Sequence, residues 1–270
     1  MEYIADFFSL HEHIAVITGG GGVLAGGFAD ALLKAGAKVS LWGRGSQSIE
    51  KRLKELSDMG FEEMLHTAIV DTYSEEQVLK ALDKTEKALG IPDILINGVG
   101  GNLGKSPFTQ TDVGVFESVL KLNIVAGLVV PTKVFGARWI ESGVSGSIIN
   151  IASMSSYIPL SGVWAYDAAK AGVLNLTKAC AKEFAPYGIR VNAIATGFFL
   201  GKQNRSLLIN DTTGELTERG KAVIEHTPFG RFGQPHELAG ALVFLASNRA
   251  SGFVTGICIP VDGGYLAYNI

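Results

Sequence analysis

Residues 13–27 read HIAVITGGGGVLAGG, in which a run of apolar residues passes through Thr18 into a cluster of glycines. A helical pattern follows and continues to about Lys34. A strand, a glycine turn and a helix in this order predict a site where backbone N–H groups approach a phosphate at the start of a helix. The alternative interpretation is a turn that binds no ligand. The strand–turn–helix context favours the phosphate site.

Six more apolar runs follow along the chain and alternate with helical patterns. The runs cover residues 37–42, 63–70, 93–96, 147–151, 190–194 and 256–261, and the helical patterns cover 48–59, 74–89, 112–141, 163–185 and 235–248. Nearly continuous apolar strands are typical of parallel sheets that are buried on both faces. We therefore expect an α/β fold of the Rossmann type, a doubly wound parallel sheet of about seven strands with helices on both faces. One domain should span residues 1–270.

Composition limits the possible functions. The chain has 270 residues and a formal net charge of −3, so it lacks the basic surplus of a nucleic-acid-binding protein. Two cysteines do not make a disulfide framework, no secretory leader is evident, and the apolar runs are shorter than the roughly 18 residues of a membrane span. His11 and His13 have no third ligand at a suitable spacing, so no metal is expected. These observations predict a cytoplasmic protein without a membrane or nucleic-acid partner.

A second motif lies in the middle of the chain. Residues 166–170 read YDAAK, and the four-residue spacing places Tyr166 and Lys170 on one face of a predicted helix. Ser153 precedes Tyr166 by thirteen residues, just after a predicted strand, and Asn123 lies in the preceding helical segment. An isolated Tyr-x-x-x-Lys often arises by chance as an aromatic residue beside a surface amine. Four positions in this order are a far more specific signal of a catalytic site.

These features resemble the short-chain dehydrogenase/reductase family, whose glycine turn usually reads T-G-x-x-x-G-x-G. Thr18 and Gly19 match that pattern, whereas Val23 and Ala25 occupy the places of its second and third glycines. The path of the turn is therefore left open. The resemblance covers nearly the whole chain and implies that this turn binds a dinucleotide through Gly19, Gly22 and Leu24.

The resemblance also implies a role for each residue of the second motif. Reduction of a ketone needs a hydride on carbon and a proton on oxygen, and a free tyrosine has a pKa of about 10, too high for ready proton exchange. A nearby ammonium and an oxidised nicotinamide would lower that pKa. Tyr166 is then the acid and base, and Lys170 tunes it and binds the nicotinamide ribose. Ser153 bonds the substrate oxygen, and Asn123 holds a water in a proton relay.

The end of the second predicted strand, residues 41–44, reads LWGR. The acid that would bind the ribose hydroxyls of NAD is absent there. Arg44 could instead meet a 2′-phosphate with two hydrogen bonds, although a solvated surface arginine is the alternative. The sequence therefore favours NADP(H) as the cofactor, and NAD(H) remains possible.

Other cofactor contacts follow only from the resemblance. Asp71 takes the place of an acid that bonds the adenine amino group, and a plain helix N-cap is the competing interpretation. Asn97 and Gly98 match a segment that passes close to the adenosine. Phe198 lies in the segment that holds the nicotinamide carboxamide.

The predicted substrate loop, at about residues 198–230, resembles the D-mannonate oxidoreductase branch of the family. That branch shares the GGGGVL turn and the Gly-Gly-Asn at residues 100–102. The resemblance implies a keto sugar acid of the D-fructuronate/D-mannonate type as substrate. Arg205, with Lys202, could pair its carboxylate. Side chains that could bond its hydroxyls are Asn102, Gln203 and Asn204.

Several alternatives stay open. The alternative interpretation of Arg205 is a surface charge on a mobile lid. The substrate could be another carbonyl compound, such as a ketose, gluconate or a 3-oxoacyl thioester, and a non-catalytic NAD(P)-binding sensor is a third reading. The helix predicted over 163–185 carries many small residues, and similar proteins pair this helix with its copy, so a homotetramer is expected.

Overall fold

The computed structural model describes residues 2–201 and 205–268 and contains one sheet of seven parallel strands. The strand order is β3-β2-β1-β4-β5-β6-β7. The strands are β1 (Ile14–Thr18), β2 (Lys38–Gly43), β3 (Leu65–Ile69), β4 (Ile94–Asn97), β5 (Ser147–Ser153), β6 (Arg190–Thr196) and β7 (Cys258–Val261). Each lies within or overlaps a predicted apolar run, so the predicted α/β architecture is confirmed.

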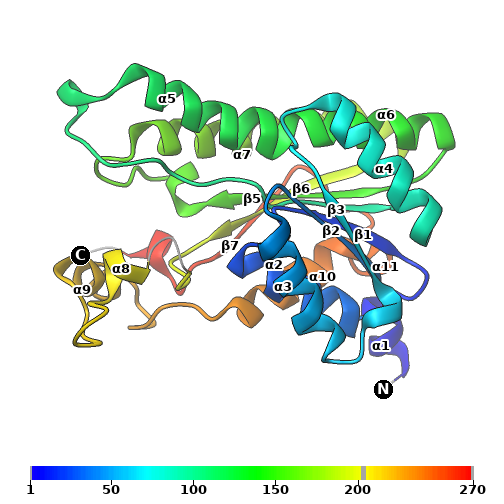
Figure 1. The fold of residues 1–270 in the computed structure, drawn as a ribbon, viewed down its shortest axis with the longest axis horizontal. Coiled ribbons are helices and arrows are strands. Elements are labelled where there is room, and N and C mark those ends of the chain that lie inside the picture. Colours follow the sequence, from blue (N-terminus) through cyan, green and yellow to red (C-terminus); the bar gives the residue numbers. More distant parts are fainter. Residues whose placement is uncertain (1, 202–204, 269–270) are drawn as a thin grey trace.

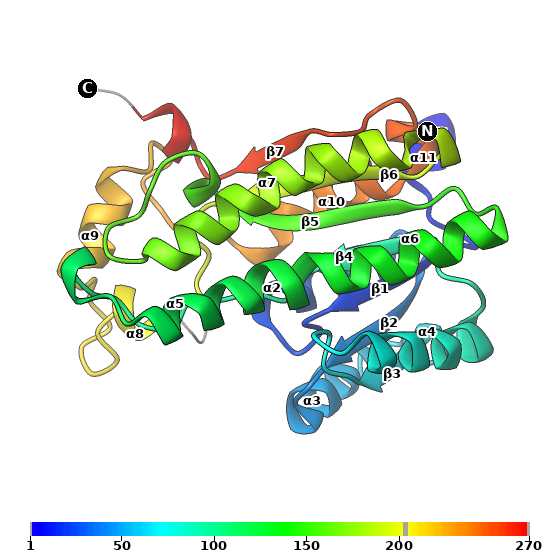
Figure 2. The same cartoon turned by 90° about the horizontal axis from the view of Figure 1, so that it is seen from above.

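Helices cover both faces of the sheet (Figures 1 and 2). One face carries α4 (Glu75–Leu89), α5 (Val113–Leu120), the π-helix η3 (Lys121–Val129), α6 (Val130–Ser142) and α7 (Trp164–Phe184). The other carries α2 (Val23–Lys34), α3 (Ser46–Ser57) and α10 (Ala239–Ala246), with the short α1 (Glu2–Phe8) and α11 (Asn248–Ser251) at its edge. Short 3-10 turns join these elements: η1 (Glu62–Met64), η2 (Phe108–Gln110), η4 (Met154–Ser156), η5 (Ala185–Tyr187), η6 (Pro235–Leu238) and η7 (Tyr265–Ala267).

The core consists of two main apolar clusters, one on each face of the sheet. Successive residues of a strand point to opposite faces. In β1, Ile17 joins the cluster that contains Phe28 of α2, whereas Val16 joins the cluster that contains Phe135 and Trp139 of α6. All five residues of β1 are buried, which explains why the first four, residues 14–17, are apolar.

A single long helix runs through residues 113–142 as α5, η3 and α6. By length and composition alone it is apolar enough to cross a membrane. In the fold, its second half packs on the sheet through Val134, Phe135 and Trp139. Its middle turns are wider than α-helical turns, and they contain Asn123.

Two segments extend the predicted architecture. The helix α1 was not expected from the sequence; it is held by a hydrogen bond from Ser247 Oγ to the Phe7 carbonyl (2.6 Å) and by an ion pair between Asp6 and Arg249. The predicted substrate loop contains α8 (Arg205–Leu208) and α9 (Glu218–Glu225). These two helices form a lobe at one end of the molecule, near the carboxyl ends of β5, β6 and β7 (Figure 1).

Candidate active site

The structure brings Ser153, Tyr166 and Lys170 together. Ser153 ends β5 and is 5% exposed, and its side chain hydrogen-bonds that of Tyr166 in the first turn of α7. Lys170 lies one helical turn further on, with Nζ 5.6 Å from the centroid of the Tyr166 ring. The four-residue spacing on α7 therefore gives the shared face that was predicted.

Burial sets the acidity of these groups. It raises the pKa of Tyr166; the hydrogen bond with Ser153 acts in the opposite direction, and the charge of Asp167 raises that pKa further. Burial also lowers the pKa of Lys170 to about 8, and Lys170 Nζ donates to the Ile151 carbonyl at 2.7 Å. The site thus holds a protonated phenol beside an amine whose pKa of about 8 lies below the usual lysine value.

Asn123 fixes the turn that follows β4. Its Nδ2 donates to the carbonyls of Gly101 (2.7 Å) and Val119 (2.9 Å), and its Oδ1 accepts from the Gly101 N–H (3.0 Å). A Cβ atom at Gly100 would lie 2.7 Å from that Oδ1 and 3.3 Å from Lys170 Nζ. Both amide protons are used, so only a remaining lone pair of Oδ1 is left for a water. The relay through Asn123 stays a prediction.

The glycine turn fits a pyrophosphate. Gly19 has a φ of +71°, and a Cβ atom there would lie 2.9 Å from the Gly98 carbonyl oxygen. The Gly22 N–H donates to the Gly19 carbonyl at 2.9 Å, and Gly22 is the N-cap of α2. No side chain of the described residues caps this helix, so its first N–H groups are available to an anion. Leu24 lies in the first turn and packs against the core.

Two residues predicted to contact the adenosine lie near the ends of β2 and β3. Arg44 directly follows β2 and is exposed. Asp71 is half-buried, and its Oδ1 accepts from the Tyr73 N–H at 3.1 Å. The N-cap of α4 is Ser74, whose Oγ accepts from the Gln77 N–H at 3.3 Å. The interpretation of Asp71 as a helix N-cap is therefore wrong.

Asn97 points into the protein. It is 2% exposed, and its Nδ2 donates to Thr132 Oγ1 (3.0 Å) and to Asn150 Oδ1 (2.8 Å). This side chain joins β4 to β5 and α6, so a contact between Asn97 and a cofactor would have to come from its backbone. The neighbouring Gly98 N–H donates to Thr18 Oγ1 at 3.1 Å, which joins the turns after β4 and β1.

The predicted substrate residues are more dispersed. Asn102 is exposed, and its Nδ2 donates to the Gly104 carbonyl at 2.5 Å. The Arg205 side chain is 56% exposed, with Nε 3.7 Å from Asp211 Oδ1. The Phe198 ring packs edge-on against Tyr265, with 5.5 Å between centroids. Three of the predicted substrate residues lie outside the described part of the chain: Lys202, Gln203 and Asn204.

Two supporting residues were missed by the sequence analysis. Ser156 Oγ donates to the Lys170 carbonyl at 2.7 Å, and Asp167 Oδ1 accepts from the Leu160 N–H at 3.2 Å. Together they tie the segment after Ser153 to the start of α7. The signal that could have identified Ser156 is its spacing from Ser153, which is that of a capping box. The two serines do form such a box at η4.

Comparisons with known proteins agree with this geometry. Residues 22–266 match a family model described as enoyl-(acyl carrier protein) reductase. An uncharacterized oxidoreductase of Bacillus subtilis (strain 168), UxuB, is 40% identical, and the match covers 96% of this chain and 98% of the relative.

Two solved structures superpose over almost their whole length. One, provisionally described as a D-mannonate oxidoreductase from Haemophilus influenza with bound NAD, is 36% identical with a TM-score of 0.89, over 98% of this chain and 99% of that one. The other is a gluconate 5-dehydrogenase from Burkholderia cenocepacia J2315 in complex with NADP and tartrate; it is 32% identical with a TM-score of 0.87, over 99% and 100% of the two chains.

The fold and the Ser153, Tyr166 and Lys170 cluster define a nicotinamide-dependent oxidoreductase. The chain belongs to the short-chain dehydrogenase/reductase family. The family resemblance that was recognised from the sequence is thereby confirmed.

Proposed function

We propose that this protein transfers a hydride between a nicotinamide dinucleotide and a keto sugar acid of the D-fructuronate/D-mannonate type. The observation that carries the proposal is the contact of Tyr166 with Ser153 beside the buried Lys170. The choice of a sugar acid is supported by the descriptions of the two superposed structures, one provisionally a D-mannonate oxidoreductase and the other a gluconate 5-dehydrogenase.

Each residue of the cluster has a distinct role in this proposal. Tyr166 gives its phenol proton to the carbonyl oxygen during reduction and takes it back during oxidation. Ser153 Oγ orients that oxygen toward Tyr166. The Lys170 ammonium favours the phenolate that remains after proton transfer. The bound dinucleotide supplies or accepts the hydride.

The proposed cofactor site runs from the glycine turn to the end of β2. Gly19, Gly22 and Leu24 would hold the pyrophosphate at the start of α2, and Arg44 would bind a 2′-phosphate, which favours NADP(H) over NAD(H). Exposed Arg44, directly after β2, supports this preference. In the Arg44→Ala variant, the dissociation constant for NADPH should rise about tenfold or more and that for NADH should change little. An unchanged ratio of the two constants would show that Arg44 does not select the cofactor.

Arg205 is proposed to bind the substrate carboxylate. Its present partner is Asp211, so this contact requires Arg205 to leave that ion pair when substrate binds. The proposal requires substrate binding to bury the new ion pair, and the loss of one partner from such a pair should reduce kcat/KM for a keto acid by roughly a hundredfold in Arg205→Ala, with a much smaller effect on a neutral ketose. Equal losses for both substrates would mean that Arg205 only supports the lobe. Asp211→Asn is the matched control, because it breaks the same ion pair and keeps the guanidinium.

The decisive experiment is a panel of carbonyl substrates assayed with both dinucleotides. Keto uronates should be turned over with the highest kcat/KM. Gluconate is the second candidate, because one superposed structure is described as a gluconate 5-dehydrogenase. Higher activity on a ketose or a 3-oxoacyl thioester would overturn the sugar-acid assignment, and binding of a dinucleotide without any turnover would indicate a sensor.

We also propose a cytoplasmic homotetramer. Exposed small residues on α7, at Ala168, Ala171 and Ala179, leave room for close contact with a second copy of that helix. A light-scattering mass of four chains at micromolar concentration is expected. The mass of a single chain would contradict the proposal.

A further inference from the structure

Helix α3 packs directly on the glycine turn. A Cβ atom at Gly21 would lie 2.4 Å from Ser48 Oγ, and one at Gly26 would lie 2.4 Å from Arg52 Cζ. Glycine at these two positions therefore allows α3 side chains to reach the backbone around the start of α2. The family pattern has its second and third glycines at positions 23 and 25 instead, where this chain has Val and Ala.

The Arg52 side chain connects the two helices. Its Nη2 donates to the Gly22 carbonyl at 3.2 Å, and its Nη1 pairs with Glu55 Oε2 at 2.6 Å. The Gly22 carbonyl is also the acceptor for the Gly26 N–H, at 3.3 Å, in the first turn of α2. Arg52 is 22% exposed, and its Nε is buried with no hydrogen-bond partner among the residues that the structure describes.

We propose that Arg52 is a positioning residue that holds the glycine turn in its anion-binding conformation. The inference rests on the dinucleotide site proposed above. A run of four glycines has high conformational freedom, and ordering it on binding would weaken affinity. A guanidinium fixed by Glu55 and bonded to the N-cap carbonyl orders that run before the cofactor arrives. It also adds a positive charge near the pyrophosphate.

The proposal predicts an equal effect on both cofactors, because NADH and NADPH share the pyrophosphate. In Arg52→Ala, the dissociation constants measured from the fluorescence of each reduced dinucleotide should both rise about tenfold, with kcat at saturating cofactor within about twofold of wild type. Arg52→Lys should restore part of the affinity, since it keeps the charge but not the planar fork. Lys51→Ala is the matched control. Lys51 directly precedes Arg52 on α3 and is 64% exposed, with Nζ 3.8 Å from Glu55 Oε1, and its substitution should leave both constants unchanged.

A double-mutant cycle tests the contact itself. A Cβ atom at residue 26 would displace the guanidinium, so Gly26→Ala should weaken both cofactors as Arg52→Ala does, and the double variant should be no weaker than either single variant. Additive losses would overturn the proposal. A loss confined to NADPH would overturn it too, because Arg52 would then read the 2′-phosphate.

Hydrogen exchange provides a readout that needs no cofactor. In unliganded Arg52→Ala, the amides of residues 19–26 should exchange faster than in wild type, while those of β5 should not change. Unchanged exchange in the turn would overturn the proposal whatever cofactor the protein uses. Failure of the wild-type protein to bind either dinucleotide would instead contradict the proposed cofactor site.

Discussion

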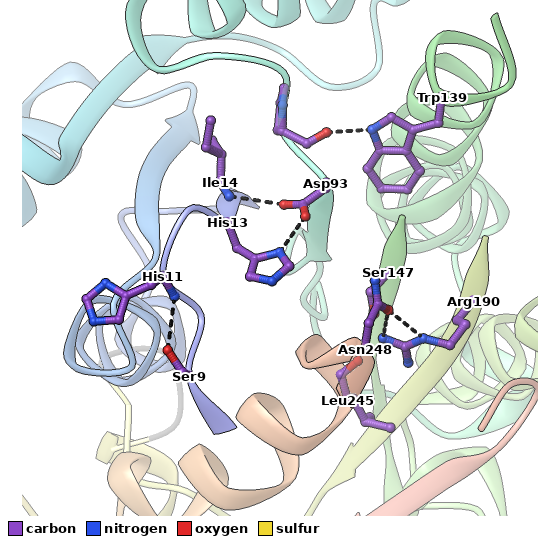
Figure 3. A network of polar contacts seen from close by, with 11 residues as sticks. Ser9, His11, His13, Ile14, Asp93, Trp139, Ser147, Arg190, Leu245 and Asn248 are labelled. Atoms are coloured by element: carbon purple, nitrogen blue, oxygen red, sulfur yellow. Dashed lines mark hydrogen bonds and ion pairs between the residues drawn. The ribbon is translucent and has the colours of Figure 1, made fainter. Parts of the chain in front are cut away.

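The amino ends and the carboxyl ends of the central strands use their polar groups differently. At the amino ends, polar side chains close hydrogen bonds between neighbouring segments (Figure 3). Asp93, before β4, accepts from the Ile14 N–H at 3.0 Å and lies 2.5 Å from His13 Nδ1. Arg190, at the start of β6, donates through Nη2 to Asn248 Oδ1 at 2.9 Å, and Trp139 Nε1 donates to the Pro92 carbonyl at 2.6 Å.

At the carboxyl ends, two buried polar atoms lack such a partner. Ser155 Oγ and Asp167 Oδ2 have no hydrogen-bond partner among the described residues. Lys170 is 5% exposed, and burial lowers its pKa to about 8. A buried polar atom without a partner costs about 1–3 kcal/mol. The end of the sheet that contains the candidate site therefore carries a stability cost at these two atoms.

The comparison predicts that substitutions at the two ends will have separable effects. Changes at the carboxyl ends should alter turnover or its pH dependence and leave unfolding almost unchanged. Changes at the amino ends should lower the stability and leave turnover intact at temperatures where the protein is folded.

The largest effect is expected at Tyr166. Tyr166→Phe removes the phenol proton and keeps the ring, so kcat should fall by about a thousandfold. The dissociation constant of the dinucleotide and the melting temperature should stay close to their wild-type values. Steady-state kinetics, fluorescence titration and calorimetry check these three quantities. A variant with near wild-type kcat would show that Tyr166 is not the acid and base.

At the opposite end, Arg190→Ala should act on stability. It removes a buried guanidinium and leaves its partners Asn248 and Ser251 without their donor, at a cost of about 3 kcal/mol. For a chain of this size that cost corresponds to a melting temperature lower by about 6–12 °C. At 20 °C, kcat should be unchanged. A loss of kcat without a loss of stability would contradict the separation of the two ends.

A smaller effect is expected from Asp167→Asn, and it should appear in the pH profile. The Asp167 charge raises the pKa of Tyr166, in addition to the effect of burial, and Lys170 is the other charged group beside the phenol. Reduction needs the protonated phenol, so its rate is lost as the pH rises through that pKa. Without the carboxylate, this alkaline loss should move to lower pH. The amide can still accept from the Leu160 N–H.

The measurement is kcat/KM for reduction as a function of pH. Glu183→Gln is the control, because Glu183 is exposed on the same helix and its change should leave the profile in place. A shift to higher pH, or no shift, in Asp167→Asn would show that the Asp167 charge does not act on Tyr166.

The smallest effect is expected at Asp93. Its hydrogen bond raises the pKa of His13, with a further contribution from its charge, although burial opposes both. The pair therefore stabilises the fold fully below the usual histidine pKa of about 6.5, and that contribution is lost as the pH rises through the raised pKa of His13. Asp93→Asn should lower the melting temperature by about 3 °C at pH 6 and by less at pH 9.

His66, whose pKa is shifted in the opposite direction, does not disturb this test. Burial, helped by Lys84, lowers the pKa of His66, so its contribution to stability falls as the pH drops below about 6.5. Because His66 is present in both proteins, its effect cancels when their melting temperatures are subtracted at each pH. A difference between the two proteins that grows toward pH 9 would contradict the role of the His13–Asp93 pair.

Local patterns in the sequence were sufficient to predict the sheet and the reacting cluster. Apolar runs predicted all seven strands. Five of them, β1, β2, β4, β5 and β6, are buried along nearly their whole length, and such strands need apolar residues at successive positions, whereas the edge strands β3 and β7 are only partly buried. The spacing of Tyr166 and Lys170 placed both on one face of α7, since residues four apart on a helix are neighbours.

The tertiary structure alone decided which distant segments meet. It turned the Asn97 side chain toward Thr132 and Asn150 and brought Arg52 to the Gly22 carbonyl. The two partners in the Asn97–Asn150 contact are 53 residues apart, and those in the Arg52–Gly22 contact are 30 residues apart. Helix and strand periods are set by neighbours in the chain and can be read from the sequence. Contacts of this kind depend on how whole elements pack, which no local pattern encodes.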